Sequence, residues 1–375
     1  MCSETKRICF LGFGTYPILT KKQQYDAGGA ELQQVLIAQE LVSTGYEVTI
    51  IDFDYDQGSV EEIDGIKVIK TFKPKNKTSI VDYLVNIPKI ISALNRSDAE
   101  IYYHRSGILF IPLLFSKIRR KKFLYSVAHD TMVERTKGKS VNIKYLLKRL
   151  DIYLNIRRAD MVLAQSVYQQ KLIYQNHSKR SIVVKNIYDV RVRTIDKDVE
   201  PLVLWVATLR DWKRPEIFVE LSKKFPRVRF CMIGGPSENA MLYESTRSAS
   251  KSLPNFEFMG FVPLHEIEMY FEKAWIFVNT SEKEGFPNTF LQAWANYTPV
   301  VSLDVDPDEI ICEHQLGFHS KTFNQMVLDI EFLLNNNGLR KEYGVNGYNY
   351  ITQNHNARNI VEKYDEIFKT IYCSE

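Results

Sequence analysis

The segment Asn279–Ala295 reads NTSEKEGFPNTFLQAWA and decides the fold, because it joins the end of a predicted buried strand to the start of a predicted helix. The run Trp275–Val278 before it is short, apolar and rich in strand-forming residues, which indicates a buried strand. Pro287 favours the first helical turn, so the free amides that follow it point outward with the positive end of the helix dipole. The segment therefore predicts a site for a ligand that carries phosphate groups.

Two polar residues of this segment are candidates to contact such a ligand. Glu284 lies where the chain leaves the strand, and Gln292 follows eight residues later, just over two helical turns away. A residue at the loop tip and one on the helix can reach the same elongated ligand. The alternative is an ordinary turn between strand and helix, with a solvated Glu284 and with Gln292 on the surface.

The same segment resembles the retaining glycosyltransferases of family 4, whose second domain carries an acidic residue, seven others and a second acidic residue in the context EGFPN…EA. The resemblance extends over nearly the whole chain. It implies an α/β protein of the GT-B fold, in which two Rossmann-like doubly wound domains face each other across a cleft. It also implies that Glu284 binds hydroxyls of the donor sugar. Further donor contacts are expected from Gly285, Phe286, Asn288, Thr289 and Gln292.

Gln292 departs from the family motif, which has an acid that binds the ribose at this position. A neutral amide can still donate to and accept from a ribose diol. It lacks the charge-assisted hydrogen bond, which is roughly twice as strong as a neutral one.

The segment Trp205–Pro215 resembles the family motif VGRLxxxKG, in which an Arg and a Lys clamp the donor phosphates. Lys213 matches the Lys, whereas Thr208 stands at the Arg position and Arg210 is close enough to substitute for it. The alternative for Lys213 is an ordinary surface lysine. Backbone contacts to the donor phosphates and base are expected from Gly234, Gly235, Phe261 and Val262, although glycine ends many strands.

The first domain contributes two candidates by the same resemblance. Gly28 and Gly29 precede a predicted helix in the segment DAGGAE, where the family has a GGAE loop near the donor diphosphate, and glycines allow close backbone approach. His129 follows a predicted strand, where the family places a catalytic His near the donor sugar. The alternatives are a glycine-led helix start without a ligand and a His that only bonds a neighbouring backbone group.

The segment Gly12–Pro17, GFGTYP, holds the first two glycines of a dinucleotide-binding fingerprint. Asp52 or Asp54 stands at about the later sequence position where that fingerprint has the acidic residue that binds the ribose. Pro17 replaces the third glycine, and a long loop separates the segment from the next helix. Both features remove the tight turn that cradles a pyrophosphate, so we do not expect a nicotinamide oxidoreductase.

Composition supports a two-domain globular protein. The chain has 375 residues, is 45% hydrophobic and carries a net charge of +4, which is too small to indicate nucleic acid as a partner. The five cysteines form no CxxC pair, which favours a reducing compartment. No His or Cys spacing suggests zinc, and amide dipoles with Lys213 can neutralise a diphosphate, so we expect no metal. We also expect no cofactor, because the nucleotide sugar is a substrate. The longest apolar stretch, Ile108–Phe115, is far shorter than a membrane span, and we expect a cytoplasmic protein.

Strands and helices alternate along the chain, with one charged, linker-like interruption at Tyr188–Glu200. We expect an acceptor-binding domain over residues 1–190, a nucleotide-sugar-binding domain over 191–356 and a helix over 357–375 that crosses back to the first domain. The expected strands are Arg7–Gly14, Glu47–Phe53, Ile101–His104, Lys122–Val127, Met161–Gln165, Ile182–Lys185, Leu202–Ala207, Arg229–Ile233, Phe256–Met259, Ile276–Val278 and Pro299–Ser302.

A basic segment, Lys139–Arg158, has helical periodicity in its apolar residues. One interpretation is a helix that buries this apolar face in the domain core and exposes its lysines. The other is contact with anionic lipid headgroups or with a lipid-linked diphosphate acceptor, which would make the protein peripheral on the inner face of the membrane. The apolar residues at helical spacing are Ile143, Leu146, Leu147, Leu150, Tyr153 and Leu154.

These features together predict a retaining, metal-independent hexosyltransferase that uses a UDP- or GDP-sugar donor and a glycan or lipid-linked acceptor in polysaccharide or glycan biosynthesis. By resemblance, the reaction is a front-face transfer in which Glu284, Lys213 and helix amides stabilise the departing diphosphate and the sugar cation. The alternatives are a catalytically silent GT-B scaffold or partner subunit, and a GT-B-type sugar epimerase or phosphorylase.

Overall fold

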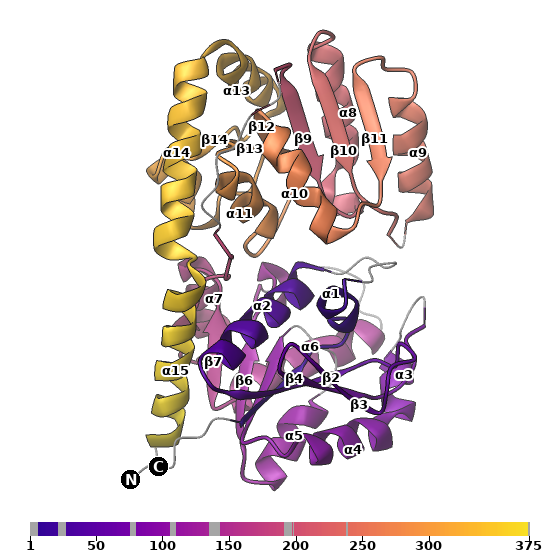
Figure 1. Cartoon of the computed structure of the whole chain (residues 1–375), viewed down its shortest axis with the longest axis vertical. Coiled ribbons are helices and arrows are strands. Elements are labelled where there is room, and N and C mark those ends of the chain that lie inside the picture. Colours follow the sequence, from indigo (N-terminus) through magenta and orange to yellow (C-terminus); the bar gives the residue numbers. More distant parts are fainter. Residues whose placement is uncertain are drawn as a thin grey trace. The chain divides into compact units, whose positions relative to one another are not determined.

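The computed structural model describes residues 7–21, 28–75, 80–105, 110–134, 143–190, 197, 199–237 and 239–373. The chain forms two compact α/β units (Figure 1). The first unit comprises Met1–Ile187 and Ala357–Glu375, and the second comprises Tyr188–Asn356.

The first unit is built on an eight-stranded sheet in the order β3-β4-β2-β1-β5-β6-β7-β8. All neighbouring strands are parallel except the antiparallel pair β3–β4. The central strands are almost continuously apolar and buried, as expected for a parallel sheet covered on both faces. The strands are β1 (Arg7–Leu11), β2 (Glu47–Asp52), β3 (Val60–Ile63), β4 (Ile66–Lys70), β5 (Ile101–Arg105), β6 (Lys122–Ser126), β7 (Met161–Ala164) and β8 (Ile182–Val183).

Helices cover both faces of this sheet. α2 and α15 pack on one face with Ile8 and Phe10 of β1, whereas α4, α5 and α6 pack on the other face with Cys9 and Leu11. α15 contacts α2 and buries Tyr364. The helices are α1 (Tyr16–Leu19), α2 (Gly29–Ser43), α3 (Ile80–Val85), α4 (Ile87–Ser97), α5 (Ile111–Ile118), α6 (Ile143–Arg158), α7 (Val167–His177) and α15 (Ala357–Cys373), with a 3-10 turn η1 at Asp130–Met132.

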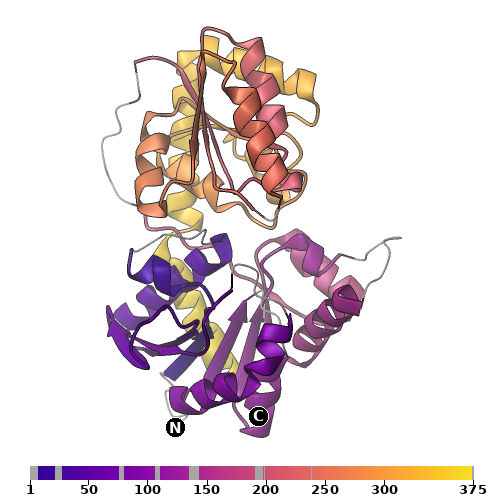
Figure 2. The ribbon, with the colours of Figure 1, turned by 90° about the vertical axis from the view of Figure 1, so that its right-hand side faces the viewer.

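The second unit has a six-stranded parallel sheet in the order β11-β10-β9-β12-β13-β14, with helices on both sides (Figure 2). α10, α11 and α14 share one core with Leu204 of β9, and α8 and α13 share the other core with Trp205. The strands are β9 (Leu202–Val206), β10 (Arg229–Ile233), β11 (Phe256–Gly260), β12 (Ile276–Asn279), β13 (Val300–Ser302) and β14 (Gly317–His319).

The helices of the second unit alternate with these strands, and no helix in the part of the chain that the structure describes has the length and apolar character needed to span a bilayer. They are α8 (Pro215–Lys224), α9 (Ala240–Ser250), α10 (Leu264–Lys273), α11 (Asn288–Ala295), α12 (Ile310–Glu313), α13 (Phe323–Asn335) and α14 (Asn337–Asn354), with 3-10 turns η2 (Asp211–Lys213) and η3 (Pro307–Glu309).

Candidate active site

The strand order of the second unit marks where a ligand is expected to bind. The chain passes from β9 to β10 and β11 on one side, and then returns to place β12, β13 and β14 on the other side. In open parallel sheets, ligands bind at the carboxyl ends of the strands where the order reverses. Here that point lies between β9 and β12. Lys213 follows β9 and Glu284 follows β12.

Lys213 and Glu284 contact each other at this edge of the sheet. Lys213 Nζ forms an ion pair with Glu284 Oε1. The two side chains are only 18% and 11% exposed, so solvent screens the pair less than it would on an open surface. The structure therefore brings together one cation and one carboxylate, both predicted from the sequence.

Hydrogen bonds fix the loops that carry this pair. Thr280 Oγ1 donates to the carbonyl oxygen of Lys213 at 2.6 Å and accepts from Trp205 Nε1 at 2.9 Å. Arg214 Nε donates to the carbonyl oxygen of Thr280 at 2.7 Å, and the Arg214 guanidinium pairs with Asp304. The loops after β9 and β12 are thus bonded to each other, which orients Lys213 in advance of any ligand. No motif in the sequence had indicated Thr280 or Arg214.

Arg210 lies near this pair in sequence but has a different environment. Its side chain is exposed, and its guanidinium lies over the Trp212 ring at 5.3 Å from the ring centroid. Thr208, at the position of the family Arg, is half-buried. Lys213 is therefore the basic residue that the structure places against Glu284.

α11 begins immediately after the Glu284 loop, as the sequence predicted. Its N-cap is Pro287, and its first two residues, Asn288 and Thr289, are half-buried. Gln292 is buried, with 6% of its surface exposed, and its carbonyl oxygen accepts a hydrogen bond from Asn296. The surface alternative for Gln292 is therefore wrong.

Gly285 and Phe286 in the same turn are both buried. The Phe286 ring lies in the core of the unit, with its centroid 5.0 Å from that of His355. Any contact of Phe286 with a ligand would therefore come mainly from its backbone.

The glycines after β10 have a structural reason to be there. A Cβ atom on Gly234 would lie 1.9 Å from the carbonyl oxygen of Ala207, so only glycine allows the two loops to approach. The Gly235 carbonyl oxygen accepts a hydrogen bond from the Leu209 amide at 3.0 Å. After β11, Phe261 is 36% exposed and Val262 is buried.

The first unit carries the remaining predicted residues. Gly28 is the N-cap of α2 and Gly29 is its first residue, whereas Asp26 and Ala27 of the predicted loop lie outside the described residues. His129 caps η1, and its Nδ1 accepts a hydrogen bond from the Thr131 amide at 3.2 Å. A neutral His129 ring therefore carries its proton on Nε2. The alternative to a catalytic role for His129 predicted such a bond to a neighbouring backbone group.

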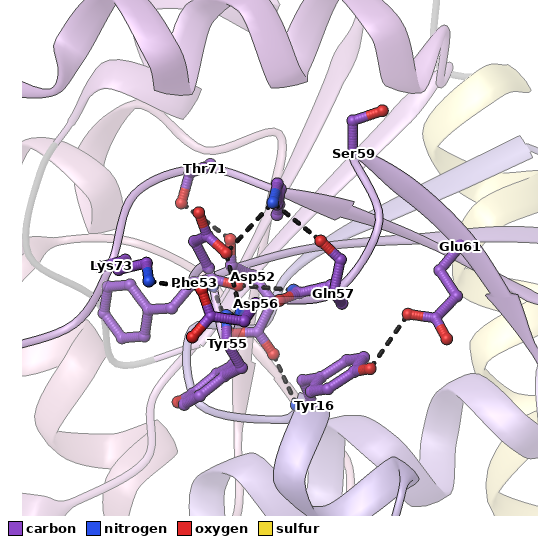
Figure 3. A network of polar contacts seen from close by, with 12 residues as sticks. Tyr16, Asp52, Phe53, Tyr55, Asp56, Gln57, Ser59, Glu61, Thr71 and Lys73 are labelled. Carbon is purple, nitrogen blue, oxygen red and sulfur yellow. Dashed lines mark hydrogen bonds and ion pairs between the residues drawn. The ribbon is translucent and has the colours of Figure 1, made fainter.

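Asp52 has a structural role in the first unit (Figure 3). Its Oδ1 accepts from the amides of Gly14 and Phe53, both at 2.6 Å, and its Oδ2 accepts from the Tyr16 amide at 2.6 Å and from Thr15 Oγ1 at 2.8 Å. Three of these bonds, from Gly14, Thr15 and Tyr16, hold the loop after β1, and the fourth joins Asp52 to the next residue of its own chain segment. Since both oxygens are occupied, Asp52 is not available to bind the ribose of a dinucleotide.

Comparison with known proteins identifies the family. Residues 190–350 match the family model described as Glycosyl transferases group 1, and residues 27–191 match the model described as Glycosyltransferase Family 4. The chain belongs to glycosyltransferase family 4, so it is grouped with transferases of sugars and not with nicotinamide oxidoreductases.

Curated relatives match most of the chain at low identity. An uncharacterized glycosyltransferase of Haemophilus influenzae is 21% identical over 83% of this chain and 88% of its own. An uncharacterized glycosyltransferase of Methanocaldococcus jannaschii is 25% identical over 74% of this chain and 77% of its own.

Solved structures show the same fold, that of the GT-B glycosyltransferases. Sucrose-phosphate synthase from Thermosynechococcus elongatus superposes with a TM-score of 0.81 at 15% identity, covering 99% of this chain and all (100%) of that one. HepE from Anabaena, solved with UDP and glucose, has a TM-score of 0.74 at 15% identity, covering 97% of this chain and 100% of its own.

Proposed function

We propose that this glycosyltransferase moves a hexosyl unit from a nucleotide diphosphate sugar to a hydroxyl acceptor, with retention of the anomeric configuration, in the synthesis of a glycan or polysaccharide. The observation that carries the proposal is the Lys213–Glu284 pair at the carboxyl ends of β9 and β12. This is where an open α/β sheet binds its ligand. HepE, a structural neighbour, was solved with UDP and glucose, which supports a nucleotide-sugar donor.

In the proposed reaction, Lys213 and the amides at the start of α11 bind the donor diphosphate. Negative charge grows on this group as the bond from the sugar to the phosphate oxygen breaks, so a fixed cation stabilises the transition state more than the ground state. Glu284 binds hydroxyls of the donor sugar, and an oxygen of the leaving diphosphate takes the proton from the acceptor. The ion pair seen here would open to admit the donor.

A thermal-stability screen against nucleotide sugars tests this proposal. A donor at 100 times its dissociation constant adds about 2.7 kcal/mol to the free energy of unfolding. We expect one class of nucleotide sugar to raise the melting temperature and then to release its nucleoside diphosphate when acceptor is added. Stabilisation without turnover would indicate the silent scaffold, and turnover without an acceptor would indicate an epimerase.

Gln292→Ala is expected to weaken nucleotide binding. If the buried amide binds the ribose diol, its removal costs about 1–3 kcal/mol in affinity, because ribose hydroxyls are left without partners. Calorimetry with the nucleoside diphosphate measures the change, and Gln292→Glu, which restores the family carboxylate, should keep or tighten binding. Wild-type affinity in Gln292→Ala would remove the residue from the site.

A lipid-linked acceptor is proposed from the surface of α6. Four of the apolar residues that recur at helical spacing in α6 are exposed. The interpretation in which the helix buries this apolar face in the domain core is therefore wrong for these four residues. Asp151, Ile152 and Asn155 form the buried side of the helix instead. The exposed residues are Leu146 (54%), Leu147 (39%), Leu150 (49%) and Tyr153 (45%).

Basic residues adjoin this exposed apolar surface. Lys148 and Arg158 are exposed, whereas Arg149 donates to the carbonyl oxygens of Met132 and Glu134 at 3.2 and 3.0 Å and therefore supports the fold. Leu146, Leu150 and Tyr153 help to line a groove of about 310 Å³. An apolar surface beside basic residues fits the boundary between headgroups and acyl chains of an anionic membrane. We propose that the protein lies in the cytoplasm and binds the inner face of a membrane through α6.

We expect reversible, salt-sensitive binding to anionic vesicles. Each basic residue near the surface contributes about 1 kcal/mol of attraction, and the exposed leucines add apolar burial. Two double variants should each abolish cosedimentation: one carries Lys148→Glu and Arg158→Glu, and the other carries Leu146→Asp and Leu150→Asp. Leu328→Asp is the matched control, because Leu328 is 56% exposed but lies on α13 of the second unit. Equal binding to neutral and anionic vesicles at low salt would contradict the proposal.

A further inference from the structure

Three metal-binding side chains meet at the carboxyl edge of the second sheet. Asp306 follows β13, Cys312 lies in α12 and His319 ends β14. One donor atom of each residue, a carboxylate oxygen, the sulfur or a ring nitrogen, lies within 4.8 Å of those of the other two. None of the three has a role in the sugar transfer proposed above.

Asp306 supplies an independent indication of a ligand. Its side chain is only 1% exposed. Oδ1 accepts a hydrogen bond from the Ile311 amide at 2.8 Å, and the thiol and amide of Cys312 lie close to the carboxylate, whereas Oδ2 makes no hydrogen bond of ordinary geometry within the described part of the chain. Oδ2 faces His319 Nδ1 at 3.9 Å. A buried carboxylate oxygen without a partner is costly, and a bound cation would satisfy it.

The chemistry of the three donors selects the kind of ion. A thiolate, an imidazole and a carboxylate together suit zinc, whereas magnesium and calcium prefer oxygen ligands alone. With bond lengths of about 2.0–2.3 Å, the donors of a tetrahedral zinc site are separated by roughly 3.3–3.6 Å. The three donor atoms lie within 4.8 Å of one another, and Asp306 Oδ2 and His319 Nδ1 are 3.9 Å apart, so side-chain rotations would close the site.

The surrounding backbone is suited to hold such an ion. The Ile311 amide fixes the Asp306 carboxylate through its other oxygen, which is a common way to orient a metal ligand. Next to His319, the Ser320 amide donates to the carbonyl oxygen of Ser302 at 2.8 Å, and Ser302 Oγ donates to that of Val305 at 2.6 Å. The segments that carry Asp306 and His319 are therefore hydrogen-bonded to each other.

We propose that Asp306, Cys312 and His319 bind one zinc ion, with water in the fourth position, and that the ion fixes residues 303–309 against β14. This role is structural, and the ion takes no part in the chemistry of the proposed sugar transfer. It departs from the expectation of no metal, because a D-x5-C-x6-H spacing is not one that indicates zinc in a sequence. Asp304 in the same segment pairs with Arg214, beside Lys213, so the ion would also steady one side of the candidate active site.

Titration of the untagged, chelator-treated protein with Co²⁺ and then Zn²⁺ tests the proposal. We expect one equivalent of Co²⁺ to produce thiolate-to-metal charge-transfer absorption, Zn²⁺ to displace it, and Zn²⁺ to raise the melting temperature. Cys312→Ser should abolish the absorption, and both Cys312→Ser and His319→Ala should weaken Zn²⁺ binding at least about 100-fold. His314→Ala is the matched control, because this exposed histidine lies between two of the ligands but outside the cluster.

Absence of the charge-transfer absorption in the wild type would overturn the proposal, as would absorption that survives Cys312→Ser. Zn²⁺ binding that is equal in wild type and both variants would show a site elsewhere and would also overturn it. Circular dichroism checks that each variant is folded. Cys312 is exposed, so Cys312→Ser is expected to fold and keeps the test decisive if His319→Ala does not.

Discussion

Lys213→Ala is expected to lower kcat by about 10²- to 10³-fold, the usual loss when one fixed group that stabilises developing negative charge is removed. Lys213 is held against Glu284, and its backbone is bonded to Thr280, so its charge needs little reorganisation when the diphosphate departs. Steady-state kinetics with the nucleotide sugar that stabilises the wild type measure this change.

Lys223→Ala is the matched control for Lys213→Ala. Lys223 lies on α8 of the same unit, is 46% exposed and pairs with Glu220, a neighbour on its own helix. Its removal should leave kcat within about twofold of the wild type, because an exposed ion pair contributes little. If Lys213→Ala and Lys223→Ala had the same kcat, Lys213 would have no part in the reaction.

Asp52→Asn is expected to lower the free energy of unfolding by about 2–5 kcal/mol, since the loss of a partner for each buried donor costs about 1–3 kcal/mol. The amides of Gly14, Tyr16 and Phe53 and the Thr15 hydroxyl all donate hydrogen bonds to this carboxylate. An Asn side chain offers one accepting oxygen and turns an NH₂ group towards the remaining donors. Urea denaturation monitored by circular dichroism measures the loss.

Asp56→Asn provides the comparison for Asp52→Asn. Asp56 lies four residues further along and pairs with Lys73, and both side chains are well exposed, 78% and 64%. An exposed pair of this kind contributes about 0–1 kcal/mol, so the variant should unfold close to the wild type. Equal stability of the two variants would mean that the Asp52 network does not hold the β1 loop.

The sequence was sufficient for most of the sheet architecture but not for its edges. Each strand expected from an apolar run is present. The hairpin β3–β4 was missed because β3 reads VEEI, whose charged residues lie at an edge of the sheet and do not form an apolar run. β14 was missed because three residues, GFH, give no periodicity to detect.

α6 shows why helical periodicity alone can assign the wrong face. The apolar residues recur at helical spacing, yet Asp151 and Asn155 lie on the buried side. Asn155 Nδ2 donates to the carbonyl oxygen of Asp151 at 3.0 Å, so this polar side chain is accommodated inside by a bond within the helix. Such a bond depends on the folded environment, and nothing in the residue pattern indicates it.

The candidate site was predictable only where a motif carried it. Glu284 and Lys213 belong to recognisable segments, and their contact follows from the adjacency of β12 and β9. Thr280 and Trp205 support that contact through single hydrogen bonds between distant segments, for which a sequence offers no signal. The cluster of Asp306, Cys312 and His319 was missed for the same reason, since only the fold brings the three side chains together.

The most direct test of donor binding at the Lys213–Glu284 pair is one paired measurement on Glu284→Gln: turnover of the stabilising nucleotide sugar, and calorimetric affinity for its nucleoside diphosphate. Because Glu284 is assigned to the sugar and not to the nucleotide, we expect turnover to fall about 10²-fold or more while nucleoside diphosphate affinity stays close to that of the wild type. Unchanged turnover, with affinity for the nucleoside diphosphate lost, would contradict the assignment.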